Sequence, residues 1–582
     1  MRSAIFRKAS LVFLACLLTC FAGASLWADQ GDPPGRVARL STTQGNVSLQ
    51  PSGESDWSQA TLNYTVTTGD RLYTDQGARA ELEVGPFAVR MSEATDLTMA
   101  NLNDQLMQLG LGQGSIRVTV YDLPAGSSVE IDTPNGALTL LQPGSYRVDN
   151  DANGTLVSVN QGSLQVSGGG ANQTVESGQA VQLTGTDTVQ VSPVALPGED
   201  DFDQWCDSRD ARIRSFQSRQ YVSPDTPGAE ELDTYGTWQT VPEYGLVWYP
   251  AGVAVGWAPY RVGHWAWIEP WGWTWVEDEP WGFCPFHYGR WAFIGSAWGW
   301  VPGPVAVVPF YAPALVAFVG GGGFSIGIGV QAWFPLGPRE PFFPWYHYGG
   351  GYLRAVNVTN VRVTNIDTII NVRNVTDIHY VNRNAVTAVS TETFRSGQPV
   401  TRGMVRVPPE QIARMQVVAH PEVTPNRTAA FGGRAPVAAP VMRSAGPTGR
   451  PPEMRGTQPE RPRIAPAPPA STRTAPAPIE GGQPPRATAP STGNAPSGVG
   501  VRSGPPSQAP RFITRTPPPP SNVPFSAKEP ALAQHPGRPL EPQQTQNLRA
   551  GKPAGPMRDK EFPPHPSAKP APRSGEESRP KH

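Results

Sequence analysis

Residues 37–191 alternate apolar and polar side chains in short runs that are separated by turn residues. The runs at 80–84, 116–120 and 145–148 place an apolar residue at every second position. A period of two is typical of strands that bury one face, and the Gly, Asn and Asp between the runs favour turns. The pattern predicts a mainly β fold, as a β-sandwich or a short β-solenoid. Residues 97–109 interrupt the alternation and are predicted to form a loop or a brief helix.

A second pattern concerns tryptophan, which recurs with a nearly fixed period after the β segment. Twelve of the 17 tryptophans lie between Trp238 and Trp300, and the motif Gly-x-Trp begins each unit. The three units begin at Gly236, Gly263 and Gly289, so they are 27 and 26 residues apart. Such a period indicates one small supersecondary unit that is copied and stacked. The sequence predicts a Trp-rich β-repeat domain of three units over 235–304.

The segment 200–220 joins these two regions and has the pattern of a short amphipathic helix. Its apolar members are Phe202, Trp205, Ile213 and Phe216. The aspartates at its start suit the first turn of a helix, where negative charge is favourable. We therefore predict one short helix here.

The pattern weakens beyond the repeats. Residues 305–400 are rich first in Gly, Pro and aromatic residues, for which irregular packing against the repeats is predicted, and then in Asn and Val. Branched residues at every third position from 363 to 381 fit neither a strand nor a helix, although β-branching favours extended structure. Residues 406–582 are dominated by Pro, Ala, Arg and Ser, so little apolar surface is available to offset the entropy lost on ordering. We predict that they form a disordered, basic tail.

Charge sets this tail apart from the body of the chain. The formal net charge is −1, yet residues 401–582 hold 25 of the 47 Lys and Arg and only 11 of the 48 Asp and Glu. A basic tail on an acidic body indicates contact with an anionic partner, such as cell-wall polymer, or with the body itself. A solvated tail is the alternative. Nucleic acid is not predicted as a partner, because the tail offers almost no aromatic rings for base stacking.

Residues 1–28 have the features of a secretory signal peptide. A basic start precedes an apolar stretch, and Ala-Gly-Ala at 22–24 or Ala28 offers a cleavage site. An uncleaved membrane anchor and a lipoprotein site at Cys16 or Cys20 are the alternatives. Export predicts a periplasmic or outer-envelope location.

Export to an oxidising compartment bears on the two remaining cysteines, Cys206 and Cys284. A disulfide between them is the candidate pairing. Two separate buried thiols are the equal alternative, because the sequence does not show whether the two Cα atoms come within bonding range.

Six motifs follow one another in the β segment. They occur at 68–74 (TGDRLYT), 80–82 (AEL), 112–118 (GQGSIRV), 131–136 (IDTPNG), 144–148 (GSYRV) and 160–164 (NQGSL). In this order they resemble the FecR-type domain, over residues 37–191. The resemblance implies a β-rich periplasmic domain without catalytic residues, which in iron-uptake regulators relays a receptor signal to a sigma factor. Those regulators begin with a cytoplasmic anti-sigma segment and a transmembrane helix, whereas an export signal is predicted here.

Residues 221–304 carry a second resemblance. The Trp repeats, preceded by a short helix and a FecR-like domain, are similar to an uncharacterised family of exported bacterial proteins rich in Trp and Pro. No function comes with this similarity.

The tryptophans allow two interpretations. Flat aromatic faces stack against sugar rings, so we take Trp267, Trp271, Trp273 and Trp281 as a candidate binding surface for envelope glycan. Alternatively, the rings form the core of a small repeat domain, because copied units place equivalent residues in equivalent core sites. Both hold if only part of the set is exposed.

The sequence predicts no catalytic residue, no cofactor and no metal site. Glu277 and Glu279 lie beside tryptophans, as glycosidase carboxylates do, but near neighbours in one loop rarely lie on both sides of a glycosidic bond. The histidines of the aromatic region lack the close pairing of zinc ligands.

Together these patterns predict an exported, non-enzymatic cell-envelope protein that acts as a structural or binding adaptor. Its predicted partner is envelope glycan or another envelope protein, and membrane contact is expected only through an uncleaved signal. Two other functions stay open. One is FecR-type periplasmic signal sensing through a protein partner, and the other is a glycan-active enzyme. The oligomeric state is not predicted.

Overall fold

The computed structural model describes residues 31–320, 329–360, 378–437, 439–440 and 511–557. They belong to one compact unit, whereas a second unit, 447–510, lies outside the described residues. The predicted signal peptide also lies outside them, as does most of the run from 363 to 381. Within the described part of the chain, no helix combines the length and the apolar character that crossing a membrane requires.

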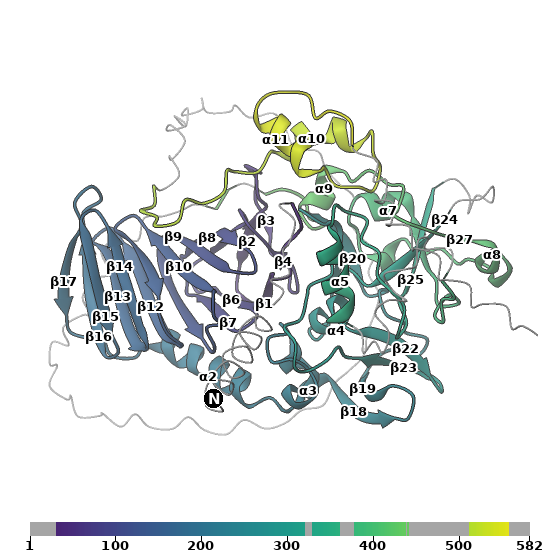
Figure 1. The fold of residues 1–582 in the computed structure, drawn as a ribbon, viewed down its shortest axis with the longest axis horizontal. Helices are drawn as coiled ribbons and strands as arrows, with labels where there is room; N and C mark the ends of the chain where they lie inside the picture. Colours follow the sequence, from purple (N-terminus) through teal and green to yellow (C-terminus); the bar gives the residue numbers. More distant parts are fainter. Residues whose placement is uncertain (1–30, 321–328, 361–377, 438, 441–510, 558–582) are drawn as a thin grey trace, which may run out of the picture. The chain divides into compact units, whose positions relative to one another are not determined.

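Residues 38–194 form a β domain of two sheets that share an apolar core (Figure 1). Its strands are β1 (Ala38–Gln44), β2 (Val47–Gln50), β3 (Ser58–Gln59), β4 (Thr65–Val66), β5 (Arg71–Thr74), β6 (Arg79–Val84), β7 (Phe87–Met91), β8 (Asp96–Leu102), β9 (Leu106–Val120), β10 (Ser128–Thr133), β11 (Gly136–Leu140), β12 (Gly144–Asp151), β13 (Gly154–Gln161), β14 (Ser163–Gly168), β15 (Ala171–Glu176), β16 (Gln179–Thr184) and β17 (Gln190–Val194). Strand β9 belongs to both sheets, because its first half pairs with β8 and β10 and its second half with β7 and β12. The mainly β prediction is confirmed.

The prediction of a loop or helix at 97–109 is wrong, because β8 and the start of β9 occupy that segment. Met107, Leu109 and Leu111 do alternate and are fully buried. The pairing of β8 with β9, however, shifts register at two places, which breaks the period of two in β8. The turn between the strands further hides the pattern.

The helix predicted over 200–220 forms as α2 (Asp201–Ser215), followed by the 3-10 turn η1 (Gln217–Gln220). The side chain of Asp200 accepts hydrogen bonds from the backbone N–H groups of Phe202 and Asp203, which caps the helix. Of the four predicted apolar members, Phe202 and Phe216 are buried, whereas Trp205 and Ile213 are only half-buried.

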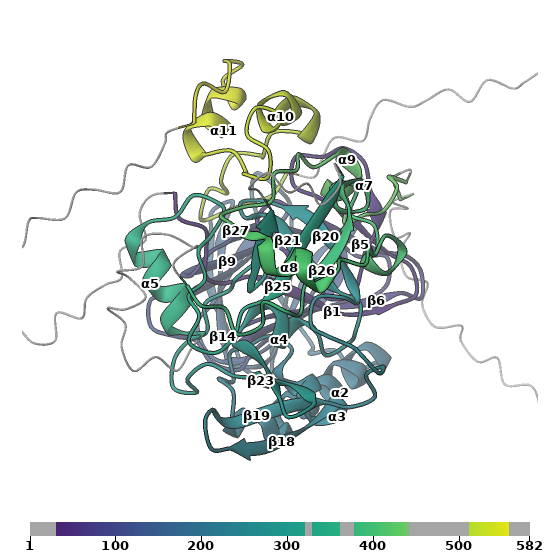
Figure 2. The same cartoon turned by 90° about the vertical axis from the view of Figure 1, so that its right-hand side faces the viewer.

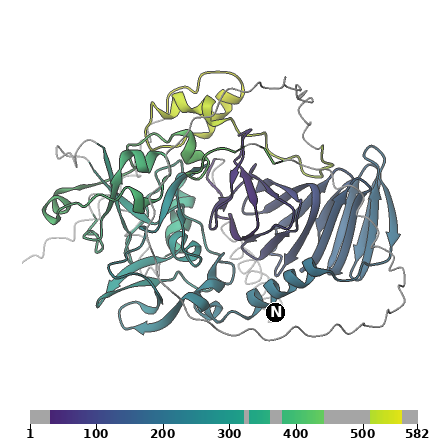
Figure 3. The same ribbon diagram turned by 180° about the vertical axis from the view of Figure 1, so that it is seen from behind.

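Electrostatics fixes where α2 lies on the β domain (Figure 3). Three arginines on neighbouring strands are register partners: Arg90 in β7, Arg117 in β9 and Arg147 in β12. Like charges opposite one another in a sheet repel unless they are paired. The helix supplies Asp203, Asp207 and Asp210 on one face, and each pairs with one of these arginines. The helix therefore neutralises an arginine row that the sequence pattern did not reveal.

Each Gly-x-Trp unit forms one β-hairpin. The hairpins are β18 (Gly236–Val241) with β19 (Gly245–Pro250), β20 (Gly263–Ile268) with β21 (Gly272–Glu277), and β22 (Arg290–Ile294) with β23 (Ala297–Val301). In each hairpin a tryptophan of the first strand faces one of the second: Trp238 with Trp248, Trp265 with Trp275, and Trp291 with Trp300. The first and third hairpins share one sheet, whereas the second is a separate two-stranded sheet (Figure 2).

The segments around these hairpins complete their aromatic core. They contain η2 (Ala229–Glu231), α3 (Leu232–Tyr235), α4 (Phe283–His287), β24 (Val316–Gly320), β25 (Val330–Pro335), α5 (Gly350–Val358), β26 (Thr387–Ser390), α7 (Thr391–Arg395), η4 (Val400–Arg402), α8 (Pro409–Arg414), β27 (Gln416–Val418) and α9 (Arg427–Ala430). Strands β26, β25, β24 and β27 form one sheet in that order. The rings of Phe318 and Trp333 lie 5.3 and 5.4 Å from that of Trp265, centroid to centroid.

The structure corrects the prediction of a disordered tail over 406–582 for two of its segments. Residues 406–437 pack on the body, and residues 511–557 include α10 (Phe525–Leu532) and α11 (Pro542–Arg549). Phe525 and Leu532 are buried, and Lys528 pairs with Glu269 at 2.6 Å. Average composition hides these few apolar anchors and ion pairs. The remaining tail lies outside the described residues.

Candidate functional site

The structure corrects the candidate glycan surface. Trp267, Trp271, Trp273 and Trp281 are all buried, with 3, 0, 0 and 1% of their surface exposed. Their rings pack edge-on or tilted against other aromatic rings, as in the contact of Trp267 with Trp273 at 5.4 Å. These four residues therefore form part of the core and offer no face to a sugar.

The glycine of each Gly-x-Trp motif explains why the motif recurs. A Cβ atom at Gly236, Gly263 or Gly289 would lie 2.3, 2.8 or 2.5 Å from Trp248, Trp275 or Trp300, the tryptophan on the second strand of the same hairpin. Only a residue without a side chain leaves room for that ring. The repeat is thus a packing unit in which glycine and the second tryptophan are complementary.

Glu277, considered above as a catalytic carboxylate, is also a core residue. It is 1% exposed, and its Oε2 accepts a hydrogen bond of 2.8 Å from Trp275 Nε1. Burial raises its pKa well above the usual range. Its hydrogen bond to the indole gives this carboxyl group a structural role in the second hairpin.

A metal site is not formed by the residues that the structure describes, since they include no group of three or more His, Cys, Asp or Glu able to hold an ion. His287, for instance, is buried and its Nδ1 lies 2.8 Å from the carbonyl oxygen of Ala312. Burial lowers the pKa of His287 to about 3, so the ring is neutral and packed.

Cys206 and Cys284 are separate buried thiols in the structure, in α2 and α4 respectively. The candidate disulfide is therefore not formed, and the alternative prediction holds. Burial raises the pKa of Cys206 to about 12 and that of Cys284 well above its usual value, so both stay protonated and unreactive.

We expect neither thiol of the folded protein to react with a thiol reagent at neutral pH, and both to react in denaturant. The measurement is the stoichiometry of thiol labelling of the mature chain with and without denaturant. Reduction before denaturation serves as the control. Labelling that requires prior reduction would contradict the structure and restore the disulfide.

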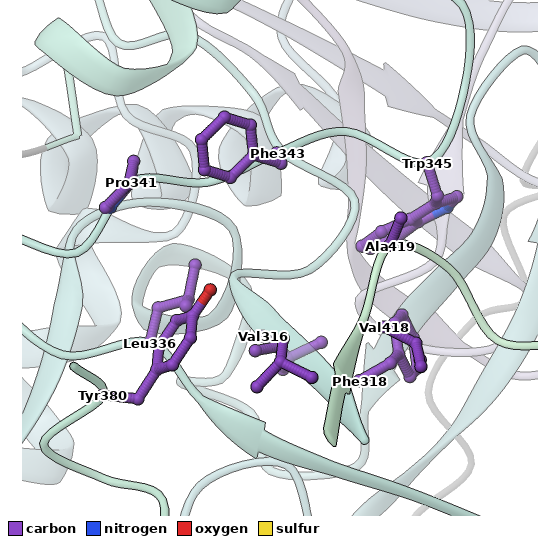
Figure 4. A pocket seen from close by; sticks show the side chains of 11 residues that line it. Val316, Phe318, Leu336, Pro341, Phe343, Trp345, Tyr380, Val418 and Ala419 are labelled. Atoms are coloured by element: carbon purple, nitrogen blue, oxygen red, sulfur yellow. The ribbon is translucent and has the colours of Figure 1, made fainter. Parts of the chain in front are cut away.

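Two cavities of the described structure are too small for an organic ligand. One of about 20 Å³ is lined by apolar residues that include Phe318, Trp345 and Val418 (Figure 4). The other, of about 40 Å³, lies beside Glu269 and Lys528. Such volumes hold one or a few water molecules, whereas ligand pockets measure about 300–1,000 Å³. Neither cavity is a small-molecule site.

A buried charge cluster joins the β domain to the Trp hairpins. Arg39 in β1 donates to Glu83 in β6 and to Glu230 in η2, both at 3.2 Å, and to the carbonyl oxygen of Pro280 at 2.8 Å. The Arg39 side chain is 1% exposed. Since the cluster draws on three separate segments, it fixes their relative placement.

The outer face of β9, β10, β11 and β14 holds a short extended segment of the tail, residues 511–516. Ile513 donates its N–H to the carbonyl oxygen of Thr133 at 3.0 Å, and the two residues form an antiparallel bridge. We call the surface under this segment the tail groove. It is formed by Gln108 and Gly110 of β9, Glu130 and Asp132 of β10, and Gly168 at the end of β14.

Glu130 is the polar centre of the tail groove. Its Oε1 accepts the backbone N–H groups of Arg515 and Thr516 at 2.8 and 3.0 Å, and its Oε2 accepts the Thr516 hydroxyl at 2.8 Å. Burial raises the pKa of Glu130, but the hydrogen bonds from Thr516, Asp132 and Arg515 together outweigh burial and lower it. A carboxylate that accepts two consecutive N–H groups binds the backbone of the segment, whatever its side chains.

Asp132 completes the polar floor of the groove. Gln108 Nε2 donates to Asp132 at 2.8 Å and to the carbonyl oxygen of Thr516 at 2.6 Å. Burial, and then the neighbouring Glu130, raises the pKa of Asp132 to about 9, so Asp132 keeps its proton at neutral pH. Of the two carboxyl groups, only that of Glu130 is therefore negatively charged, and it accepts the N–H groups of Arg515 and Thr516.

Sequence reasoning missed this groove, because its residues are far apart in the chain and match no motif of binding chemistry. One signal was present in the tail. Phe512 is the first aromatic residue after Phe431, and it opens the run Phe-Ile-Thr-Arg-Thr within Pro-rich sequence. An isolated aromatic and β-branched pair in such a context indicates an anchor.

Comparisons with known proteins agree with this organisation. Residues 70–165 match the family described as FecR protein, within the region 37–191 that resembled it, and residues 229–340 match a family of unknown function (DUF6600). No curated protein matches the chain.

Two solved structures from Parabacteroides distasonis, each described as a candidate anti-sigma factor, align with part of the chain at 11% identity. One alignment covers 22% of this chain and 60% of the other with a TM-score of 0.20, and the second covers 26% and 61% with a TM-score of 0.16. The chain thus spans less than two thirds of those structures. The chain contains a FecR domain at residues 70–165, followed at 229–340 by a domain of a family of unknown function.

Proposed function

We propose that this chain is an exported, non-enzymatic protein of the bacterial cell envelope that binds a protein partner through its FecR domain. The role is signal sensing or regulation, which the FecR match supports. One observation carries the proposal. The tail groove holds an extended segment through backbone hydrogen bonds, which is how many β-rich domains hold peptides.

Three features favour a protein partner over a glycan. The four tryptophans that would stack on sugar rings are buried in the core. Glu277 is buried as well and is hydrogen-bonded to Trp275. The two cavities described above hold no more than a few water molecules. Export is part of the proposal and follows from the predicted signal peptide at 1–28.

The proposal predicts a protein contact beside the tail groove in living cells. A photo-crosslinking amino acid at Gln165 reports it, because Gln165 is the cross-strand neighbour of Thr139, which contacts Arg515. A matched probe at the fully exposed Val255, between the first and second Trp hairpins, serves as the control. We expect a light-dependent protein adduct from position 165 and none from position 255.

A different result would reject this function. If neither position forms a protein adduct, and the purified chain sediments with peptidoglycan sacculi at high salt, the chain is a glycan adaptor. Binding to sacculi only at low salt would instead indicate a purely electrostatic contact by the basic tail, since salt screens exposed charges.

A further inference from the structure

Two glycines shape the tail groove to fit the side chains that occupy it. A Cβ atom at Gly110 would lie 2.8 Å from Cε2 of Phe512, and one at Gly168 would lie 2.2 Å from Cγ2 of Ile513. Any other residue at these positions would occupy the space that the two side chains need. The groove therefore has two adjacent recesses, one for an aromatic ring and one for a branched aliphatic side chain.

The polar contacts of the groove select an extended backbone and one hydroxyl group. Thr133 accepts the N–H of Ile513, and Glu130 accepts two further N–H groups. The hydroxyl of Thr516 is the side-chain donor to Glu130, and Arg515 Nη1 reaches the hydroxyl of Thr139 at 3.4 Å. Backbone bonds give affinity in such a site and side-chain recesses give specificity. The recognised pattern is aromatic, branched aliphatic, any residue, Arg and Thr.

The contacts of residues 511–516 are separate from those of the next part of the tail. Arg511 and Arg515 are exposed, and Phe512 and Ile513 are only half-buried. The next part of the tail is fixed elsewhere, because Phe525 donates its N–H to Glu54 at 2.6 Å and Lys528 pairs with Glu269. Residues 511–516 can therefore leave the groove while α10 keeps its own contacts.

We propose that the tail groove is a recognition site for an extended protein segment of this pattern, and that residues 512–516 are its internal competitor. The proposal rests on the proposed function and names the surface that the partner uses. A partner segment with an aromatic and branched aliphatic pair replaces residues 512–516 and takes over the same bonds to Thr133 and Glu130. The tail thereby sets the threshold at which the partner binds.

The experiment measures binding of a fluorescent peptide with the sequence of residues 509–519 (APRFITRTPPP) to the full mature chain. Three proteins are compared: wild type, the double variant Phe512→Ala/Ile513→Ala, and that double variant with Gly110→Val added. We expect the double variant to bind the peptide at least about tenfold more tightly than wild type, because its internal competitor is weakened. Gly110→Val is expected to abolish binding by filling the aromatic recess.

A peptide control keeps the test independent of protein folding. The same peptide with alanine in place of its Phe and Ile is expected not to bind the double variant. Equal affinity of wild type and double variant, no binding by either, or binding of the alanine peptide would each overturn the inference.

The crosslinking test separates this inference from the proposed function. Peptide binding in the groove without any protein adduct at Gln165 in cells would support the site and reject the function. A protein adduct in cells without peptide binding would support the function and reject the site.

Discussion

Replacing Gly289 by alanine is expected to lower the free energy of unfolding by about 2–5 kcal/mol. Gly289 has φ of +68°, a region that costs a residue with a side chain about 1–2 kcal/mol. Its new Cβ would also lie 2.5 Å from both Nε1 of Trp300 and the carbonyl oxygen of Val301. Overpacking in a dense core adds about 1–3 kcal/mol, since neighbouring rings cannot move freely. Urea unfolding followed by tryptophan fluorescence measures the loss.

The same hairpin offers a matched control. Gly295 has φ of +65°, but a Cβ there would meet nothing within 4 Å. Gly295→Ala should therefore show the backbone cost alone, about 1–2 kcal/mol. The difference between the two variants is the contribution of the contact with Trp300. Equal losses would show that glycine and tryptophan are not complementary in the repeat.

Replacing Arg39 by methionine is expected to destabilise the protein by about 3–5 kcal/mol at neutral pH. The change keeps the apolar volume but leaves Glu83 and Glu230 buried without their cation. An unpaired buried charge is far more costly than an absent ion pair, because it has lost its hydration. We expect the loss in urea unfolding experiments, and we expect Glu230→Gln in the same chain to recover part of it.

The stability that Arg39→Met loses relative to wild type should become smaller as the pH falls. Burial, together with the charge of Glu83, already raises the pKa of Glu230 well above its usual range in the native protein. A raised native pKa means that the folded state binds the proton more tightly than the unfolded state, so stability increases as the pH falls toward about 4.5. Arg39 opposes this rise in the wild-type protein, so without Arg39 the dependence extends to higher pH, and the loss of stability is expected to be smaller at low pH than at high pH.

An exposed ion pair provides the control for this prediction. Arg395 lies 3.7 Å from Glu392 one helical turn away, and both side chains are largely exposed. Arg395→Met should change stability by no more than about 0.5 kcal/mol at any pH. A loss in Arg39→Met that did not depend on pH would show that packing, rather than charge, is what Arg39 contributes.

These predictions bear on function because Arg39 and the tail groove act at different places on the β domain of residues 38–194. The Arg39 cluster ties that domain to the Trp hairpins through Glu230 and Pro280. The groove lies on β9, β10, β11 and β14 and contacts residues 511–516 of the tail. Groove variants should therefore change partner binding with little effect on stability, whereas Arg39→Met should do the reverse.

Local patterns predicted most of the elements. A period of two located strands such as β6 and the second half of β9, since an inward-facing side chain at every second position is what a half-buried strand requires. The aspartates at 200–203 located the start of α2 because they satisfy its free N–H groups. The Gly-x-Trp period marked each hairpin because glycine and ring belong to one packing unit.

Local sequence patterns did not determine which side chains are buried or which distant strands pair. Whether Trp271 faces sugar or core depends on the segments around 311 and 345 that cover it, which lie far along the chain. The sequence does not indicate the arginine row. Arg90, Arg117 and Arg147 become neighbours only when their three strands pair. Composition could not show that Phe512 and Ile513 find recesses at Gly110 and Gly168.

The sequence by itself thus determined the two repeating patterns, the sites of their turns and the contrast between an acidic body and a basic tail. Periodicity and charge are local properties, and they act through neighbours in the chain. Only the tertiary structure decided that the tryptophans form the core, that the two cysteines stay apart and that part of the tail lies in a groove of the FecR domain. Each of these outcomes depends on which surfaces exclude water from one another, and that is fixed by contacts between residues distant in the chain.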